Sequence, residues 1–196
     1  MIYVISPLGE GKKRWTWFLQ VNLYTLGVCL ASTFTGLIVG SLGLTLKLIQ
    51  LDLPFWIVGI LALAYGLKEF DFIRLPMPQR RWQVPISWIN QRPFFGSLAY
   101  GLTIGAGFLT FIPYAGFYVW TALALVIGDP KLGALLGFVY GLGRAFSVYL
   151  IGFLTTQSDQ KSVFEMSAFI FSKAQLWHRL SGFLLLVTAI YILTSA

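Results

Sequence analysis

Long uncharged runs separated by short polar stretches dominate the chain. One run extends from Trp15 to Leu46 and another from Pro93 to Gly128, and neither contains a charged residue. A helix that crosses a bilayer needs about 20 apolar residues. The pattern therefore predicts an all-α integral membrane protein with about five transmembrane helices.

The expected helices form a single transmembrane domain that comprises residues 1–196. The predicted spans are roughly 16–46, 54–68, 93–128, 132–155 and 180–195. The third run is too long for one straight crossing, and Pro113 within it removes a backbone hydrogen bond, so we expect a broken or kinked helix there. Residues 156–179 mix aromatic and charged side chains, and we expect them to form a loop and an interfacial helix.

Composition supports a membrane location. Apolar residues make up 57% of the chain and charged residues 11%, whereas soluble domains contain about 25% charged residues. A soluble chain of 196 residues could not bury so much apolar surface, because small domains keep a large fraction of their surface in water. The bilayer is therefore the first expected partner.

Lysine and arginine residues are distributed unequally between the two sides of the predicted bundle. With five crossings, one side holds Lys47 and Lys131, and Arg144 lies within a span. The other side holds Lys12, Lys13, Arg14, Lys68, Arg74, Arg80, Arg81, Arg92, Lys161, Lys173 and Arg179. Because these residues accumulate in cytoplasmic segments, we expect a cytoplasmic N-terminus and a C-terminus on the opposite side of a prokaryotic inner membrane or a thylakoid membrane. The net charge of +7 then reflects orientation, and nucleic-acid binding is not expected, since no recognition motif occurs.

The residues that most often carry chemistry are scarce. The chain contains one cysteine, Cys29, and one histidine, His178. One thiol cannot form an internal disulfide, and no zinc, P-loop or nucleophile-elbow motif occurs. We therefore expect neither an enzyme nor a metal site, and the sequence requires no cofactor.

Two pairs of segments resemble each other. Residues 24–27 align with 140–143, and residues 59–64 align with 182–187, in the same order. With five crossings the two copies run in opposite directions, which is the arrangement of an inverted repeat. The alternative is that glycine-rich apolar helices are alike in composition alone.

The segments 96–116 and 137–145 together resemble the cytochrome c biogenesis transmembrane family, of the DsbD/CcdA type. The resemblance implies two inverted repeats of three helices, in which the first helix of each repeat is broken at a Pro-Cys pair. In that family the two cysteines pass electrons from cytoplasmic thioredoxin to thiols outside.

The chain departs from that pattern at the positions that carry its chemistry. Pro113 is followed by Tyr114 where the family has cysteine, and no counterpart of the family's first helix is evident. The resemblance then implies a degenerate member with an incomplete inverted repeat, whose fourth family helix is broken at Pro113. A thiol relay needs an attacking and a resolving thiol, so Cys29 alone cannot support one.

The expected binding site surrounds the broken helix. Its candidate residues are Gly105, Gly107, Pro113, Tyr114, Tyr140 and Arg144. Broken helix ends expose backbone groups that can hold a substrate or partner, and an arginine within a span suggests function by default. The alternatives are a structural kink and an arginine that bonds to opened carbonyls or extends to the headgroups.

His178 is a weak candidate for a cofactor ligand, because it lies beside Trp177 and Arg179 at an expected membrane interface. Cys29 is expected to be a buried packing residue. Aromatic residues make up 17% of the chain and would also suit a bound lipid or pigment.

Three functional hypotheses follow. The favoured one is a CcdA-like membrane protein without thiol chemistry that serves as a non-catalytic accessory or assembly subunit, with a membrane partner that covers the face left by the missing first helix. The second is a transporter of a small solute or metal. The third is an electron carrier of cytochrome c or disulfide biogenesis that uses a cysteine of its partner.

Overall fold

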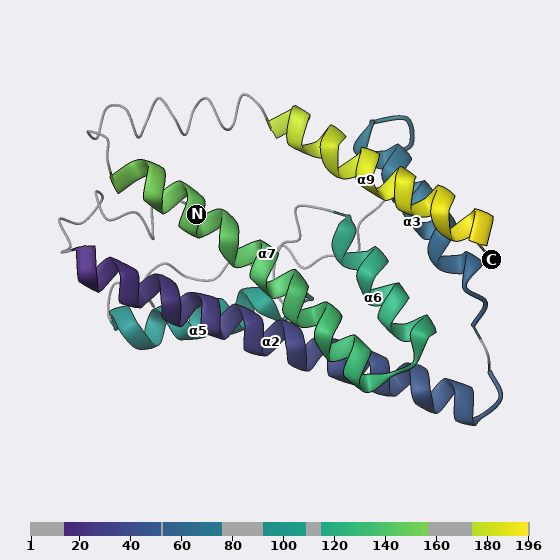
Figure 1. Ribbon diagram of the computed structural model, residues 1–196, viewed down its shortest axis with the longest axis horizontal. Helices are drawn as coiled ribbons and strands as arrows, with labels where there is room; N and C mark the ends of the chain where they lie inside the picture. Colours follow the sequence, from purple (N-terminus) through teal and green to yellow (C-terminus); the bar gives the residue numbers. More distant parts are fainter. Residues whose placement is uncertain (1–13, 52, 76–91, 109–114, 157–173, 196) are drawn as a thin grey trace.

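The computed structural model describes residues 14–51, 53–75, 92–108, 115–156 and 174–195, and within them the chain is all-helical, with no strand (Figure 1). The helices are α2 (Arg14–Leu48), α3 (Trp56–Glu69), α5 (Pro93–Gly105), α6 (Gly116–Ile127), α7 (Pro130–Thr156) and α9 (Ala174–Ser195). The prediction of an all-α protein is confirmed for these residues.

Among the described residues, three helices are long and apolar enough to cross a membrane. The segments that qualify are Trp15–Leu48, Pro130–Tyr149 and Gln175–Ser195. Helices α3, α5 and α6 have only 14, 13 and 12 residues, and at about 1.5 Å per residue each is shorter than the roughly 30 Å hydrocarbon layer. The described helices are thus compatible with a membrane location.

Glycines bring α2 and α7 into close antiparallel contact. A Cβ atom added to Gly40 would lie 2.6 Å from the carbonyl oxygen of Asp129, and one added to Gly141 would lie 3.0 Å from Cα of Cys29. Between these positions Gly36 faces Gly133, and Gly137 faces the backbone of Ser32. Small residues four apart let helix backbones approach closely, as is common in membranes.

The uncharged run from 93 to 128 forms two helices, so the prediction of a broken helix is confirmed. Helix α5 packs along α2 and ends at Gly105, and α6 begins at Gly116. Between them Gly107 has φ +70°, and the ring of Phe117 fills the space where a side chain would lie. Pro113, to which the break was assigned, lies outside the described residues.

A tight turn connects α6 to α7. Gly128 adopts φ +59°, where glycine is favoured, and ends α6. The Asp129 carboxylate then accepts hydrogen bonds from the N–H groups of Lys131 and Leu132, at 2.8 and 3.3 Å, which is the role of an N-cap residue. From α2, the Lys47 ammonium donates to the carbonyl of Ile127 at 2.7 Å.

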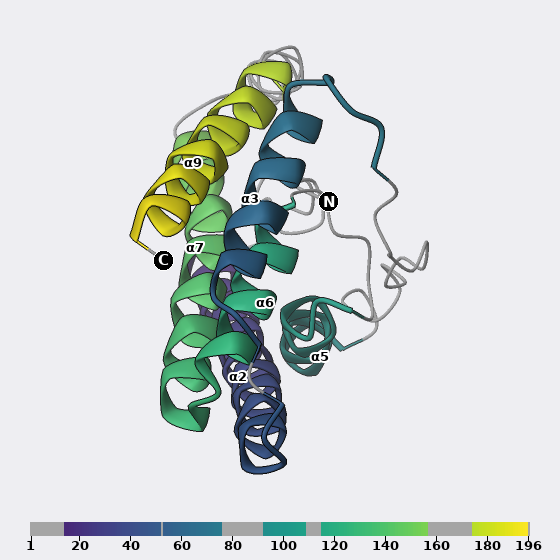
Figure 2. The same ribbon diagram turned by 90° about the vertical axis from the view of Figure 1, so that its right-hand side faces the viewer.

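Helices α3 and α9 form a second antiparallel pair, and Figure 2 shows them side by side. Their core also includes α6 and contains Val58, Ala62, Val119, Leu185 and Ala189. A separate core between α2 and α5 contains Tyr24, Val28, Tyr100 and Ile104. Because α6 contacts α2 and α7 as well as α3, it joins the two parts of the bundle.

The last helix begins earlier than the apolar pattern indicates. The predicted span 180–195 corresponds to α9, which already starts at Ala174. The charged and polar residues before Leu180 ended the predicted run, but one of them, His178, contacts α3 and is therefore part of the helix packing. Residues 157–173, where the rest of the interfacial segment was predicted, lie outside the described residues.

The predicted repeat partners are in contact. Helix α2 packs on α7, and α3 packs on α9. Contact alone does not establish an internal repeat, which stays a prediction.

Candidate functional site at the end of α3

Glu69, the last residue of α3, is a buried carboxylate shared by three helices. Its side chain is 1% exposed. Oε1 accepts a hydrogen bond from the N–H of Ala115 at 3.1 Å, and Oε2 lies 2.5 Å from Nδ1 of His178. Ala115 directly precedes α6, so the carboxylate lies at a helix N-terminus, where unpaired N–H groups and the helix dipole favour a negative charge.

His178 supplies the second contact from the start of α9. Its side chain is 41% exposed, so one part faces the surface while Nδ1 contacts the buried carboxylate. When Glu69 is ionised it can only accept hydrogen bonds, and Nδ1 of His178 is then the donor in this pair. Glu69 thereby connects the end of α3 to the beginning of both α6 and α9.

Two glycines allow this approach. A Cβ atom on Gly182 would lie 2.9 Å from Cβ of Glu69, and one on Gly66 would lie 2.9 Å from Leu186. Larger residues at either position would separate α3 from α9. The sequence thus builds the Glu69–His178 pair by placing small residues next to it.

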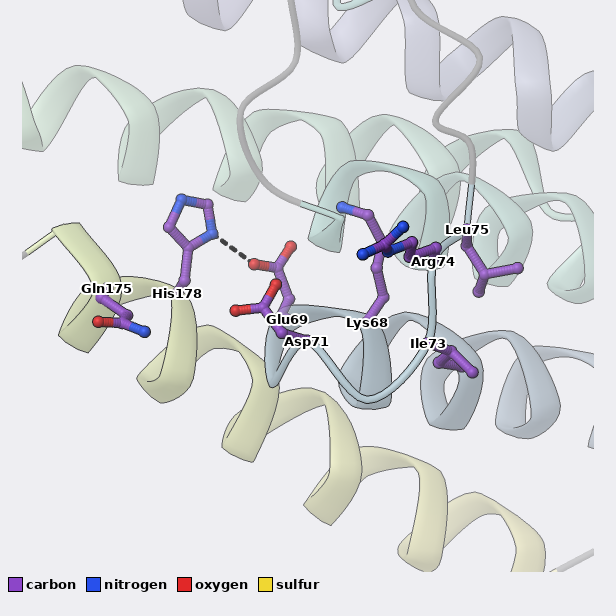
Figure 3. A pocket seen from close by; sticks show the side chains of 8 residues that line it. All are labelled: Lys68, Glu69, Asp71, Ile73, Arg74, Leu75, Gln175 and His178. Carbon is purple, nitrogen blue, oxygen red and sulfur yellow. Dashed lines mark hydrogen bonds and ion pairs between the residues drawn. The ribbon is translucent and has the colours of Figure 1, made fainter.

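An open pocket of about 490 Å³ lies beside the pair (Figure 3). Its lining residues come from the end of α3, the segment after it and the start of α9. They are Lys68, Glu69, Asp71, Ile73, Arg74, Leu75, Gln175 and His178. Figure 3 shows Gln175 and His178 on one side of the pocket and Ile73 and Leu75 on the other.

The predicted residues Tyr140 and Arg144 lie together on α7. The Arg144 guanidinium donates to the Tyr140 hydroxyl at 2.9 Å. The Tyr140 ring centroid lies 5.7 Å from that of Phe117 and 5.3 Å from that of Trp120, both on α6. Arg144 thus supports an aromatic cluster that begins one residue into α6.

The helix ends at the break are engaged by side chains. The carbonyl of Gly105 accepts a buried hydrogen bond from the Ser32 hydroxyl at 2.9 Å, and Glu69 accepts the N–H of Ala115. Backbone groups free to bind a ligand were predicted here. The carbonyl of Gly105 and the N–H of Ala115 instead form hydrogen bonds with side chains of the protein itself. Pro113 and Tyr114 lie outside the described residues, and a role for Gly105 and Gly107 in binding stays a prediction.

Sequence reasoning missed Glu69. It lies one residue beyond the predicted span 54–68, and it was not among the candidate site residues. Its partners are 46 and 109 residues away in sequence, so no local spacing reports the contact. The available signal was a glutamate at the end of one apolar run and the sole histidine at the start of another.

Over the residues that the structure describes, the fold and site define an all-helical protein with candidate membrane helices and a buried Glu–His pair. The chain is 31% identical over 152 residues to the methylamine utilization protein MauF of Paracoccus versutus, covering 75% of this chain and 55% of that protein. It is 31% identical over 173 residues to MauF of Methylophilus methylotrophus, covering 80% and 58%. It is 33% identical over 130 residues to MauF of Methylobacillus flagellatus, covering 64% and 45%.

The chain spans about half the length of the curated relatives it matches. No protein-family model matches the sequence. No solved structure matches it.

These relatives overturn the resemblance to the cytochrome c biogenesis transmembrane family. Proteins about 30% identical over most of the chain are named for methylamine utilization. The resemblance rested on glycine-rich apolar segments and one proline, features that polytopic helical proteins share because glycine permits close helix packing in membranes. The hypotheses of a CcdA-like subunit, a transporter and a thiol electron carrier depended on that resemblance and are also wrong.

Proposed function

We propose that this chain is a membrane protein that serves methylamine utilization. The observation that carries the proposal is the similarity to MauF proteins of several bacteria over 64–80% of the chain. The three long apolar helices within its described part support a role within a bilayer. Because the chain spans about half of those relatives, the proposal concerns the process and not a particular step in it.

We infer an accessory role rather than catalysis. The chain has one cysteine and one histidine, and the histidine is paired with Glu69. The buried pair joins three helices, which suits a scaffold that holds a defined shape in the membrane. A protein partner in the same membrane would use that shape.

We further propose five crossings with the N-terminus in the cytoplasm. In this arrangement α5 and α6 together make one broken crossing, since α6 follows α5 in the direction of α2. Lys47 and Lys131 then lie outside, and eleven other cations lie inside. That asymmetry follows the positive-inside rule.

The test is growth after removal of the gene from its host. We expect a deletion strain to fail on methylamine as nitrogen source and to grow normally on ammonium, and a plasmid copy to restore growth. Ammonium controls for general membrane damage. Equal growth of the deletion strain and its parent on methylamine would overturn the proposal.

A further inference from the structure

Two cations line the pocket beside the Glu69–His178 pair. Lys68 belongs to the last turn of α3, and Arg74 to the exposed segment after it. Figure 3 shows their charged ends on the same side of the pocket. Within the described residues, no ion pair joins either side chain to a carboxylate, so both retain hydrogen-bond donors for a ligand.

The carboxylates of the pocket are not equally available. Glu69 is buried and accepts bonds from Ala115 and His178. Asp71 is exposed, and Figure 3 shows it near Glu69 and away from the charged ends of Lys68 and Arg74. The pocket therefore offers a ligand two cations, Lys68 and Arg74, and one carboxylate, that of Asp71. The side of the pocket with the two cations favours an anion.

The surroundings narrow the class of anion. Arginine binds phosphate through a planar fork of donors, and lysine binds it as a point charge. Ile73 and Leu75 add apolar surface to the same pocket. The site lies where apolar helix α3 ends, which is the level at which basic side chains meet lipid headgroups, and a volume of about 490 Å³ falls in the range of small-ligand sites.

We propose that this pocket binds a phosphate group through Lys68 and Arg74, with the phosphodiester of a phospholipid headgroup as its source. The Glu69–His178 pair gives the pocket a fixed wall, because it connects three helices. This site is independent of the methylamine process proposed above.

The experiment compares lipid retention by the full chain and two matched double variants. Each is purified in mild detergent containing phosphatidylglycerol, and bound lipid is counted by native mass spectrometry. The variant Lys68→Gln with Arg74→Gln should retain about tenfold less lipid, since charge-assisted bonds to phosphate are lost. The variant Lys131→Gln with Arg179→Gln removes the same charges outside the pocket and should retain lipid like the native chain.

A charge-conserving variant protects the test against misfolding. Lys68→Arg with Arg74→Lys should keep most of the bound lipid. Equal retention by the two glutamine variants would overturn the proposal, and so would equal loss in both.

A second arm separates the two sources of phosphate. Delipidated protein is titrated with inorganic phosphate and followed by phosphorus NMR. Weak or no binding together with Lys68- and Arg74-dependent lipid retention supports the lipid source. Binding of inorganic phosphate without lipid retention overturns the lipid source.

Discussion

Glu69 and Asp71 are two residues apart, yet their carboxylates have different surroundings. Glu69 accepts one hydrogen bond at each oxygen, whereas Asp71 is exposed at the pocket edge. Alanine at position 69 removes both acceptors, whereas glutamine could keep both contacts by accepting from Ala115 and donating to Nδ1 of His178 in its other tautomer.

This difference predicts unequal effects of neutralising the two residues. Glu69→Ala should lower the free energy of unfolding by about 1 to 3 kcal/mol, because the buried N–H of Ala115 loses its acceptor. Asp71→Asn should change it by less than about 0.5 kcal/mol, as surface substitutions usually do. Denaturant unfolding in detergent micelles measures both, and an equal effect of the two would contradict the buried pair.

Two serines of α2 provide a second comparison. Ser32 donates across the bundle to the carbonyl of Gly105, whereas Ser41 donates to Leu37 of its own helix. Ser32→Ala should cost about 1 kcal/mol of unfolding free energy, and Ser41→Ala much less, because only the first leaves a buried carbonyl unpaired. The same unfolding assay applies, and a larger loss for Ser41→Ala would contradict the described end of α5.

At the scale of elements, the glycines of α7 are not equivalent. Gly137 contacts the backbone of Ser32 on α2, so a Cβ atom would force the helices apart. Gly143 has open space at the same position.

Gly137→Ala should therefore destabilise the fold by about 2 kcal/mol, as overpacking does. Gly143→Ala should be neutral or stabilise the helix by up to about 1 kcal/mol, because alanine is the better helix former. Thermal unfolding of the two variants tests this, and the reverse order would show that α2 and α7 do not pack as described.

The sequence was sufficient to predict where most helices lie, but it did not predict which side chains meet between them. Apolar runs define most helix positions because burial in lipid depends on local composition. Helix α9 starts six residues before the predicted span, in a polar stretch where His178 contacts Glu69 of α3. Arg144 was found because an arginine within an apolar run is conspicuous, and its partner Tyr140 lies one helical turn before it. Glu69 and His178 were not paired, because their contact exists only after α3 and α9 dock.

At the scale of the whole molecule, the charge asymmetry predicts how cysteine probes are labelled. Two uncharged exposed residues serve as positions, Leu51 after α2 and Gln175 at the start of α9. In a Cys29→Ala background, Leu51→Cys should react with an impermeant maleimide on intact cells. Gln175→Cys should react only after permeabilisation, since the proposed topology of five crossings would put it in the cytoplasm. Labelling of both on intact cells, or in the reverse order, would contradict that topology.

Assigning a membrane protein to a family requires more than a hydropathy pattern. Glycine-rich apolar helices with one internal proline suggested a redox family, but the relatives of this chain carry another name. Pairwise identity is counted over 130–173 aligned residues. The pattern of glycines and one proline used only a few positions, and close helix packing favours small residues in many unrelated membrane proteins.

The most direct test of the central claim is complementation of the deletion strain on methylamine as sole nitrogen source. Growth rates are compared for strains that carry the native gene, Glu69→Ala or Asp71→Asn, with ammonium as the reference condition and protein levels measured in the membrane fraction. We predict that the native gene and Asp71→Asn restore growth on methylamine, that Glu69→Ala does not, and that all strains grow alike on ammonium. Growth of the uncomplemented deletion strain on methylamine at the parental rate would contradict the account.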